Sequence, residues 1–128
     1  MAIRIVRLGS PRARGEGLRL GTVRHPPRGV PKGQHASRDF YDVWMPELAP
    51  SAALLKRAQS ADSDRAWSTF VKQYRREMAS PEKVRLLQLL AALSAASDFS
   101  VGCYCADETH CHRSVLRALL AGHGAAFV

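Results

Sequence analysis

The segment from residue 99 to residue 121 constrains the fold more than any other part of the chain. Apolar side chains alternate with small or polar ones from Phe99 onward, as in a strand that buries one face. A helical run follows and stops before Gly122. A strand joined to a helix by a short loop is the unit from which parallel sheets are built. The pattern therefore predicts an α/β fold. The residues expected on one face of this strand are Phe99, Val101, Cys103 and Cys105.

The rest of the chain extends the same pattern. Alternation predicts strands near residues 3–8 and 18–23 and an extended piece at 40–44, and helical spacing predicts helices at 52–59, 64–79 and 81–96. Asp62 or Asp64 is the expected N-cap of the second helix, and Ser80-Pro81-Glu82 marks the start of the third. We expect one three-layer α/β domain over residues 1–128, with a small, mainly parallel sheet and a C-terminal βα(β) unit.

The positive charge is concentrated at the N-terminal end. Residues 1–40 hold nine lysines and arginines against Glu16 and Asp39, so they contribute +7 of the net charge of +8. Such a basic protein can attract nucleic acid or another polyanion. A solvated, arginine-rich surface is the alternative reading of the same composition.

Composition also bears on location. No apolar run approaches the roughly 20 residues that a membrane-spanning helix requires, and the N-terminus lacks the apolar core of a secretion signal. The three cysteines lie in one segment, unlike the disulfide framework of a secreted protein. We therefore expect a cytoplasmic protein with no membrane partner.

The segment from Cys103 to Ser114 carries the candidate chemistry. It contains all three cysteines, two histidines and Arg113, where a strand ends and a helix begins. Such a junction offers free backbone N–H groups and the positive end of a helix dipole to an anion. A cysteine at a helix start beside an arginine can have a lowered thiol pKa. The candidate catalytic residues are Cys111, His112 and Arg113. A phosphatase loop is excluded, since it needs five residues between cysteine and arginine where Cys111 and Arg113 have one.

A proline-rich loop supplies further candidate groups. Residues 24–33 include three prolines and two glycines, so this loop has a stiff backbone that is neither helix nor central strand. We predict that Arg24 or Arg28 approaches the Cys-His-Arg junction and makes the site cationic. The candidate ligand-binding residues are Arg24, Arg28, Lys32, Tyr104, Arg113 and Ser114.

The cysteines and histidines also allow a metal site. Sulfur and imidazole donors suit tetrahedral zinc. Against this, the Cys-x-Cys spacing is unusual for structural zinc, and all the donors come from one short segment. Our leading interpretation has no metal and no cofactor. The alternative donor set is Cys103, Cys105 and Cys111 with His110, or with His112 in its place.

Four motifs, in this order, resemble the DUF488 family, a bacterial domain family of unknown function. The matching segments are 24–32, 44–51, 70–77 and 103–114. This chain has Pro26 where the family pattern has tryptophan, and Cys105 where an acidic or aromatic residue is more usual. The resemblance implies an α/β fold with a site at the Cys-His-Arg junction, and it implies no particular reaction.

These observations leave three functional hypotheses. The first is an uncharacterised DUF488-like protein whose cationic Cys-His-Arg cleft binds a phosphate-bearing ligand, with nucleic acid as one option. The second is a small Cys/His-dependent enzyme acting on a small anionic substrate. The third is a zinc-stabilised structural module. The sequence leaves the oligomeric state open.

Overall fold

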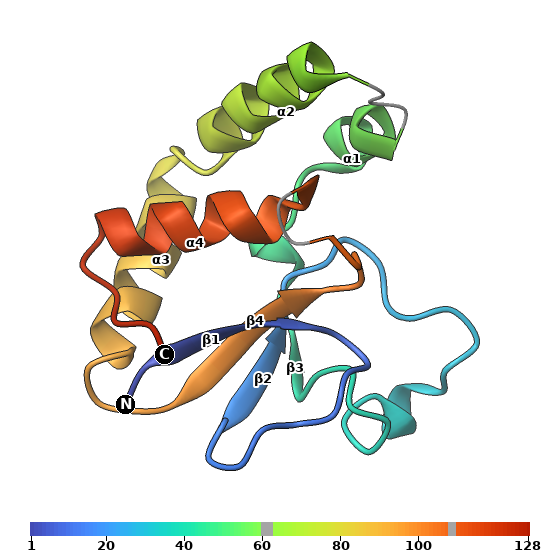
Figure 1. The fold of residues 1–128 in the computed structure, drawn as a ribbon, viewed down its shortest axis with the longest axis vertical. Helices are drawn as coiled ribbons and strands as arrows, with labels where there is room; N and C mark the ends of the chain where they lie inside the picture. The colour runs from blue at the N-terminus through green and yellow to red at the C-terminus, as the bar shows by residue number, and fades with distance from the viewer. Residues whose placement is uncertain (60–62, 108–109) are drawn as a thin grey trace.

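The sheet has four strands, and every pair is parallel. The computed structural model describes residues 1–59, 63–107 and 110–128. The strands are β1 (Ile3–Arg7), β2 (Leu18–Gly21), β3 (Val43–Trp44) and β4 (Phe99–Cys103), in the spatial order β1-β4-β2-β3 (Figure 1). The last strand in sequence is thus central in the sheet. This arrangement confirms the predicted α/β class with a small parallel sheet.

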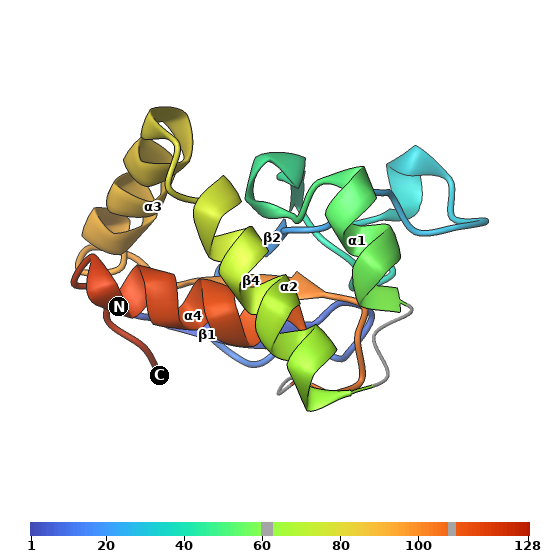
Figure 2. The ribbon, with the colours of Figure 1, turned by 90° about the horizontal axis from the view of Figure 1, so that it is seen from above.

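The helices gather on one side of this sheet (Figures 1 and 2). They are α1 (Ala52–Gln59), α2 (Asp64–Glu77), α3 (Pro81–Leu93) and α4 (His112–Gly122), with short 3-10 helices η1 (Lys32–Gln34) and η2 (Pro46–Leu48). Among the residues described, no helix combines the length and hydropathy needed to cross a membrane. The predicted N-cap of α2 was wrong: the Ser63 side chain accepts from the backbone N–H of Ala66, and Asp64 is the first helical residue. Asp62 lies outside the described residues.

One hydrophobic core joins the helices to the sheet. Phe99 and Val101 of β4 are buried on the face that the helices cover. The helices contribute to this core Leu54, Phe70, Tyr74, Leu87, Leu90, Leu116 and Leu120. Because the strand alternates, Ser100 and Gly102 lie on the opposite face. The connecting segments supply Glu16 and Tyr41 to that face, where Glu16 accepts from Ser100 and Tyr41 packs beside Gly21. Among the described residues the α-helices therefore cover one face of the sheet only, and the second helical layer expected in a three-layer domain is replaced by these segments (Figures 1 and 2).

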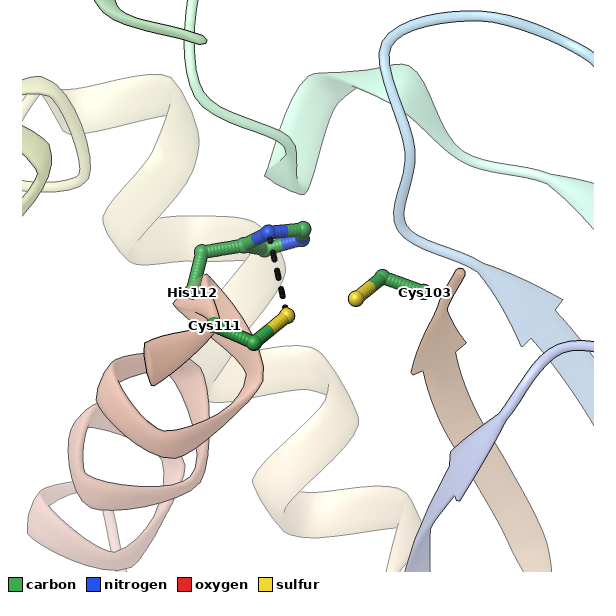
Figure 3. A group of neighbouring side chains, drawn as sticks. All are labelled: Cys103, Cys111 and His112. Atoms are coloured by element: carbon green, nitrogen blue, oxygen red, sulfur yellow. Dashed lines mark hydrogen bonds between the residues drawn. The ribbon is translucent and has the colours of Figure 1, made fainter. Parts of the chain in front are cut away.

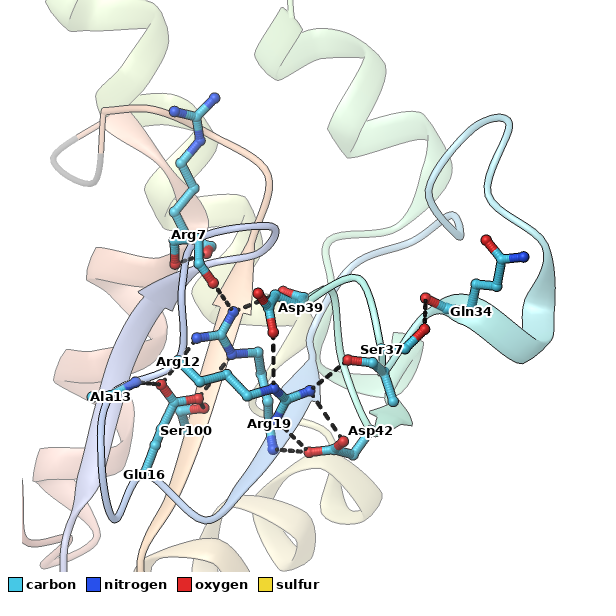
Figure 4. Close-up of polar contacts among 12 residues, drawn as sticks. Arg7, Arg12, Ala13, Glu16, Arg19, Gln34, Ser37, Asp39, Asp42 and Ser100 are labelled. Atoms are coloured by element: carbon cyan, nitrogen blue, oxygen red, sulfur yellow. Dashed lines mark hydrogen bonds and ion pairs between the residues drawn. The ribbon is translucent and has the colours of Figure 1, made fainter.

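A buried ion pair holds the loop between β1 and β2 against the sheet face opposite the helices (Figure 4). The Arg19 side chain is 0% exposed and donates from Nε and Nη2 to the two carboxylate oxygens of Glu16, at 2.8 and 2.9 Å. Its Nη1 atom donates to the carbonyl oxygens of Ser10 and Asp39. The Ser100 hydroxyl donates to Glu16 at 2.8 Å, which ties the network to β4. All three guanidinium nitrogens of Arg19 therefore have acceptors.

Most predicted strands are longer than those observed: the first two end at Arg7 and Gly21 instead of residues 8 and 23, and the extended piece begins at Val43. Strand β4 ends at Cys103, so Cys105 lies in the following loop rather than on the strand. Its neighbours explain this, because pairing with β1 stops at Arg7 and pairing with β2 stops at Gly21. The expected C-terminal strand is reduced to a single parallel bridge between Phe127 and Ile3.

Candidate functional site

Four side chains of the Cys-His-Arg junction are buried where β4 ends and α4 begins. Cys103 closes the strand, Cys111 is the N-cap of α4, and His112 and Arg113 form its first turn. In a parallel sheet this carboxyl end is where ligands bind. The junction therefore lies at the expected place for a site, with buried polar groups that need partners.

The two buried thiols and the imidazole converge (Figure 3). The Sγ atom of Cys111 lies 3.8 Å from Nδ1 of His112, and one donor atom from each of Cys103, Cys111 and His112 lies within 4.8 Å of the others. The Nε2 atom of His112 lies 2.6 Å from the carbonyl oxygen of Thr22. A carbonyl can only accept, so Nε2 carries the proton and Nδ1 presents a lone pair on the side of Cys111. Burial lowers the pKa of His112, which favours this neutral form.

Thr22 is held in place by β4. Its backbone N–H and its hydroxyl both donate to the carbonyl oxygen of Gly102, at 3.0 and 2.9 Å. On its other side β4 pairs with β1, and Gly102 allows that close approach, because a Cβ atom there would lie 2.6 Å from the carbonyl oxygen of Val6. The histidine orientation thus follows from the pairing of β2 with β4.

Cys105 lies beside the buried thiols but is itself exposed. Its backbone N–H donates to the Cys103 Sγ atom at 3.4 Å. Interaction with the thiols of Cys103 and Cys111 lowers the pKa of Cys105, and the positive charge of Arg113 acts in the same direction. Interaction with Cys105 and Cys111 raises the pKa of Cys103. Interaction with Cys103 lowers the pKa of Cys111, but interaction with Cys105 and burial outweigh it and raise that pKa to about 11, so the lowered thiol pKa expected for Cys111 is wrong. All three cysteines are free thiols.

Arg113 has an incomplete set of partners. Its side chain is buried, and Nη2 donates to the carbonyl oxygen of Cys105 at 2.7 Å. Among the described residues, the buried Nε atom has no hydrogen-bond partner, and no carboxylate forms an ion pair with this guanidinium. Arg19 is also buried, and it differs from Arg113 because each of its guanidinium nitrogens has an acceptor.

The candidate ligand-binding residues fall into two groups. Tyr104 and Ser114 lie at the junction, where the Tyr104 hydroxyl donates to the carbonyl oxygen of His25 and the Ser114 hydroxyl to that of Cys111. Arg24 instead donates to the carbonyl oxygens of Ala49 and Pro50. The proline-rich loop therefore meets the junction through backbone carbonyls rather than through the Arg24 guanidinium.

The other two cations of that loop are exposed. Arg28 is exposed on the loop itself, and Lys32 is exposed at the start of η1. Lys32 lines an open cavity of about 490 Å³ together with Tyr41 and Trp44. Among the described residues, neither cation forms a hydrogen bond or ion pair with the Cys-His-Arg segment, and Cys103, Cys111, His112 and Arg113 do not line this cavity.

His110 is outside the group of converging donors. Its ring lies 5.3 Å from that of Trp67, and its Nδ1 atom lies 3.3 Å from a carboxylate oxygen of Asp107. The histidine that approaches the thiols is His112. Of the two histidines considered as zinc ligands from sequence, the structure brings His112 to the cysteines.

Three contributors to the site lie outside the candidate catalytic and ligand-binding residues. Thr22 supplies the acceptor for His112, and Arg7 donates to the carbonyl oxygen of Tyr104 at 3.2 Å. Tyr41 is buried in one cluster with Cys103 and Cys111, and its hydroxyl has no partner among the described residues. The available signal was position, because Arg7 lies within the first predicted strand, at residues 3–8, and Thr22 lies within the second, at residues 18–23.

Comparisons with known proteins give the family. No curated protein and no solved structure matches the chain. The family model DUF488-N3a, described as the active DUF488-N3 subclade, matches residues 3–124. This match covers nearly the whole chain and includes each of the four motifs noted in the sequence. The chain therefore belongs to the DUF488 family.

Proposed function

We propose that this protein binds a small phosphate-bearing ligand at the Cys-His-Arg junction, with Arg113 as the group that holds the anion. The observation that carries the proposal is the buried Nε atom of Arg113, which lacks a partner among the described residues. A buried donor without an acceptor costs about 1–3 kcal/mol, and more when the group is charged. An oxygen of a bound anion would satisfy this donor and balance the charge.

The surroundings of Arg113 favour an anion over a neutral ligand. The residue lies in the first turn of α4, an 11-residue helix with no acidic residue in that turn. Helix N-termini attract anions through free N–H groups and the helix dipole. Arg7 donates to Tyr104 and Arg113 donates to Cys105, so two guanidinium groups lie against consecutive carbonyls of the same loop.

The family description agrees with a site that acts on a ligand. The matched subclade is called active in its own description, which is a statement about the family. For this chain, the proposal covers binding of a small anion and leaves the reaction open. Nucleic acid would enter as a larger ligand that presents the same phosphate group.

Calorimetric titration tests the proposal. Inorganic phosphate and a nucleoside monophosphate are titrated, with EDTA present, into the parent protein, Arg113→Gln and Arg85→Gln. Arg85 is an exposed arginine of α3 and serves as the matched control. Hydrogen bonds to charged groups contribute about 1.5–3 kcal/mol, so Arg113→Gln should weaken binding by about 10- to 100-fold. Arg85→Gln should leave the affinity unchanged.

Two results would overturn this proposal. One is the absence of phosphate binding by the folded parent protein at millimolar ligand. The other is equal weakening by Arg113→Gln and Arg85→Gln, which would indicate only a general effect of net charge. Circular dichroism of each variant verifies that the fold is retained.

A second candidate function is a Cys/His-dependent enzyme acting on a small anionic substrate. The 3.8 Å separation of Cys111 Sγ and His112 Nδ1 favours it, because an adjacent imidazole can take a proton from a thiol. The test is alkylation of Cys111 by iodoacetamide, followed by peptide mass spectrometry in the parent and in His112→Gln with EDTA present. Faster labelling of the parent supports this candidate, and equal labelling rates contradict it.

A further inference from the structure

We propose that Cys103, Cys111 and His112 form a zinc site with three protein ligands and a fourth position open to a non-protein ligand. This inference is independent of anion binding by Arg113. It rests on the convergence of three buried donors from the end of β4 and the start of α4 (Figure 3).

The distances fit a tetrahedral metal ion. Zinc–sulfur bonds of about 2.3 Å and zinc–nitrogen bonds of about 2.0–2.1 Å place tetrahedral sulfur and nitrogen ligands about 3.6 Å apart. The Cys111 Sγ and His112 Nδ1 atoms are 3.8 Å apart. All three donor atoms lie within 4.8 Å of one another, so contraction by about 1 Å or less would bring them to bonding geometry.

The hydrogen bonds around the donors are of the kind that orient metal ligands. A histidine that binds a metal through one ring nitrogen usually donates its other N–H to a carbonyl or carboxylate, which fixes the tautomer. His112 does this with Thr22, and its free Nδ1 faces Cys111. The backbone N–H of Cys105 donates to the Cys103 sulfur, as expected for a thiolate ligand that is held in place.

Charge balance also favours a divalent ion with two thiolates. Binding releases one proton from each of Cys103 and Cys111 to the buffer, while the Nδ1 atom of His112 has no proton to lose. A Zn²⁺ ion with two thiolates and a neutral imidazole has no net charge, which suits a buried position. A site with three protein ligands leaves room for water or a ligand atom, as in catalytic zinc centres.

Two neighbouring residues provide matched controls. Cys105 is exposed, and although its thiol interacts with those of Cys103 and Cys111, it is outside the group whose donor atoms all lie within 4.8 Å of one another. The His110 ring packs against Trp67. Substitution of these residues therefore removes a thiol or an imidazole from the same segment without removing a proposed ligand.

The experiment measures zinc directly. The full chain is stripped with EDTA, loaded with one equivalent of Zn²⁺ in phosphate-free buffer, desalted and analysed by atomic emission. We expect about one zinc per chain, and Co²⁺ loading should produce the intense visible bands of a tetrahedral ion with thiolate charge-transfer absorption. Cys111→Ser and His112→Gln should lower zinc affinity by at least about 100-fold, whereas Cys105→Ser and His110→Gln should retain the zinc.

Three outcomes would overturn the inference. Less than about one-tenth of a zinc per chain in the folded parent would exclude the site. If Cys105→Ser loses as much zinc as Cys111→Ser, Cys105 is the fourth ligand and the fourth position is not open. Zinc retention by both Cys111→Ser and His112→Gln would place the metal elsewhere. Because Co²⁺ spectra report the ligands of the parent protein, the test remains decisive even if a variant fails to fold.

Discussion

His112 and Thr22 are 90 positions apart in the chain, and Nε2 of the histidine lies 2.6 Å from the carbonyl oxygen of the threonine. This contact sets the tautomer of His112 and turns its Nδ1 atom toward Cys111. The histidine belongs to a motif that is local in sequence, whereas its partner belongs to β2. The site is therefore a product of strand pairing as much as of the Cys-His-Arg motif.

A side chain at position 102 should disturb the pairing of β4 with the neighbouring strands. In Gly102→Ala the new Cβ atom would lie 2.6 Å from the backbone oxygen of Val6, so β1 or β4 would have to shift. Overpacking of this kind costs about 1–3 kcal/mol. Gly33→Ala is the control, because a Cβ atom there meets nothing within 4 Å. Urea unfolding of both variants checks the prediction, and equal midpoints would contradict it.

The buried Glu16–Arg19 pair should make stability depend on acid pH. Burial alone would raise the pKa of Glu16, but hydrogen bonds from Arg19, Ser100 and the backbone of Ala13 outweigh it and lower the pKa from 4.5 to about 2. The folded pKa lies below the unfolded one, so the stabilisation is complete above about pH 4.5 and is lost as the pH falls toward 2. The shift corresponds to about 3 kcal/mol.

Glu16→Gln tests this account. At pH 7 the variant should be less stable than the parent by roughly 3 kcal/mol, because Arg19 keeps a buried charge without its carboxylate. The difference should shrink as the pH falls toward 2, where the parent also loses the charge. Glu47→Gln, at an exposed position, should behave like the parent. Denaturant unfolding across this pH range provides the measurement, and a pH-independent difference would argue against the account.

Ser63→Ala tests the start of α2. The Ser63 hydroxyl accepts from the backbone N–H of Ala66 at 3.1 Å, so the variant leaves a first-turn donor without its cap. Loss of an N-cap costs about 1 kcal/mol. Ser68→Ala changes an exposed serine inside the same helix and should be neutral or slightly stabilising. In thermal unfolding, Ser63→Ala should have a lower midpoint than Ser68→Ala. A Ser63→Ala midpoint equal to that of the parent would exclude the capping role.

Arginine exposure predicts which cations contribute to polyanion binding. Arg12 pairs with Asp42 and Arg19 with Glu16, whereas Arg14, Arg28 and Arg38 are exposed. If residues 1–40 attract nucleic acid, replacement of these three exposed arginines with serine should reduce the slope of log affinity against log salt by up to about 3. The matched control replaces three exposed arginines of α2, which are Arg65, Arg75 and Arg76. Fluorescence anisotropy with a labelled oligonucleotide measures both slopes, and equal changes would contradict a localised surface.

Local patterns predicted the elements well but not where they end. The helix expected at 52–59 has these bounds as α1, because apolar spacing and a serine before it define it locally. The strand expected to reach Cys105 ends at Cys103, because its length depends on where β1 and β2 stop pairing. Alternation in one strand carries no information about the ends of its neighbours.

The position of the site follows from a local sequence pattern, but the full set of residues that form it does not. The junction of Cys111, His112 and Arg113 follows from a strand that leads into a helix, which is a local pattern. The contributions of Thr22, Arg7 and Tyr41 depend on the register of β1, β2 and β4, which no local pattern reveals. Which of His110 and His112 approaches the thiols depends on the residue at which α4 begins. A sequence pattern places the start of a helix only to within one or two residues.

The central claim is that the Nε–H group of Arg113 holds an anion, and nuclear magnetic resonance of the arginine Nε–H signals tests it most directly. Inorganic phosphate is titrated into ¹⁵N-labelled protein with EDTA present, with Arg113→Lys used to assign the signal. We predict that the Arg113 signal shifts and saturates, while the Arg19 signal stays in place because its Nε already donates to Glu16. An Arg113 signal that does not move at saturating phosphate, or one that moves only in parallel with Arg19, would contradict the account.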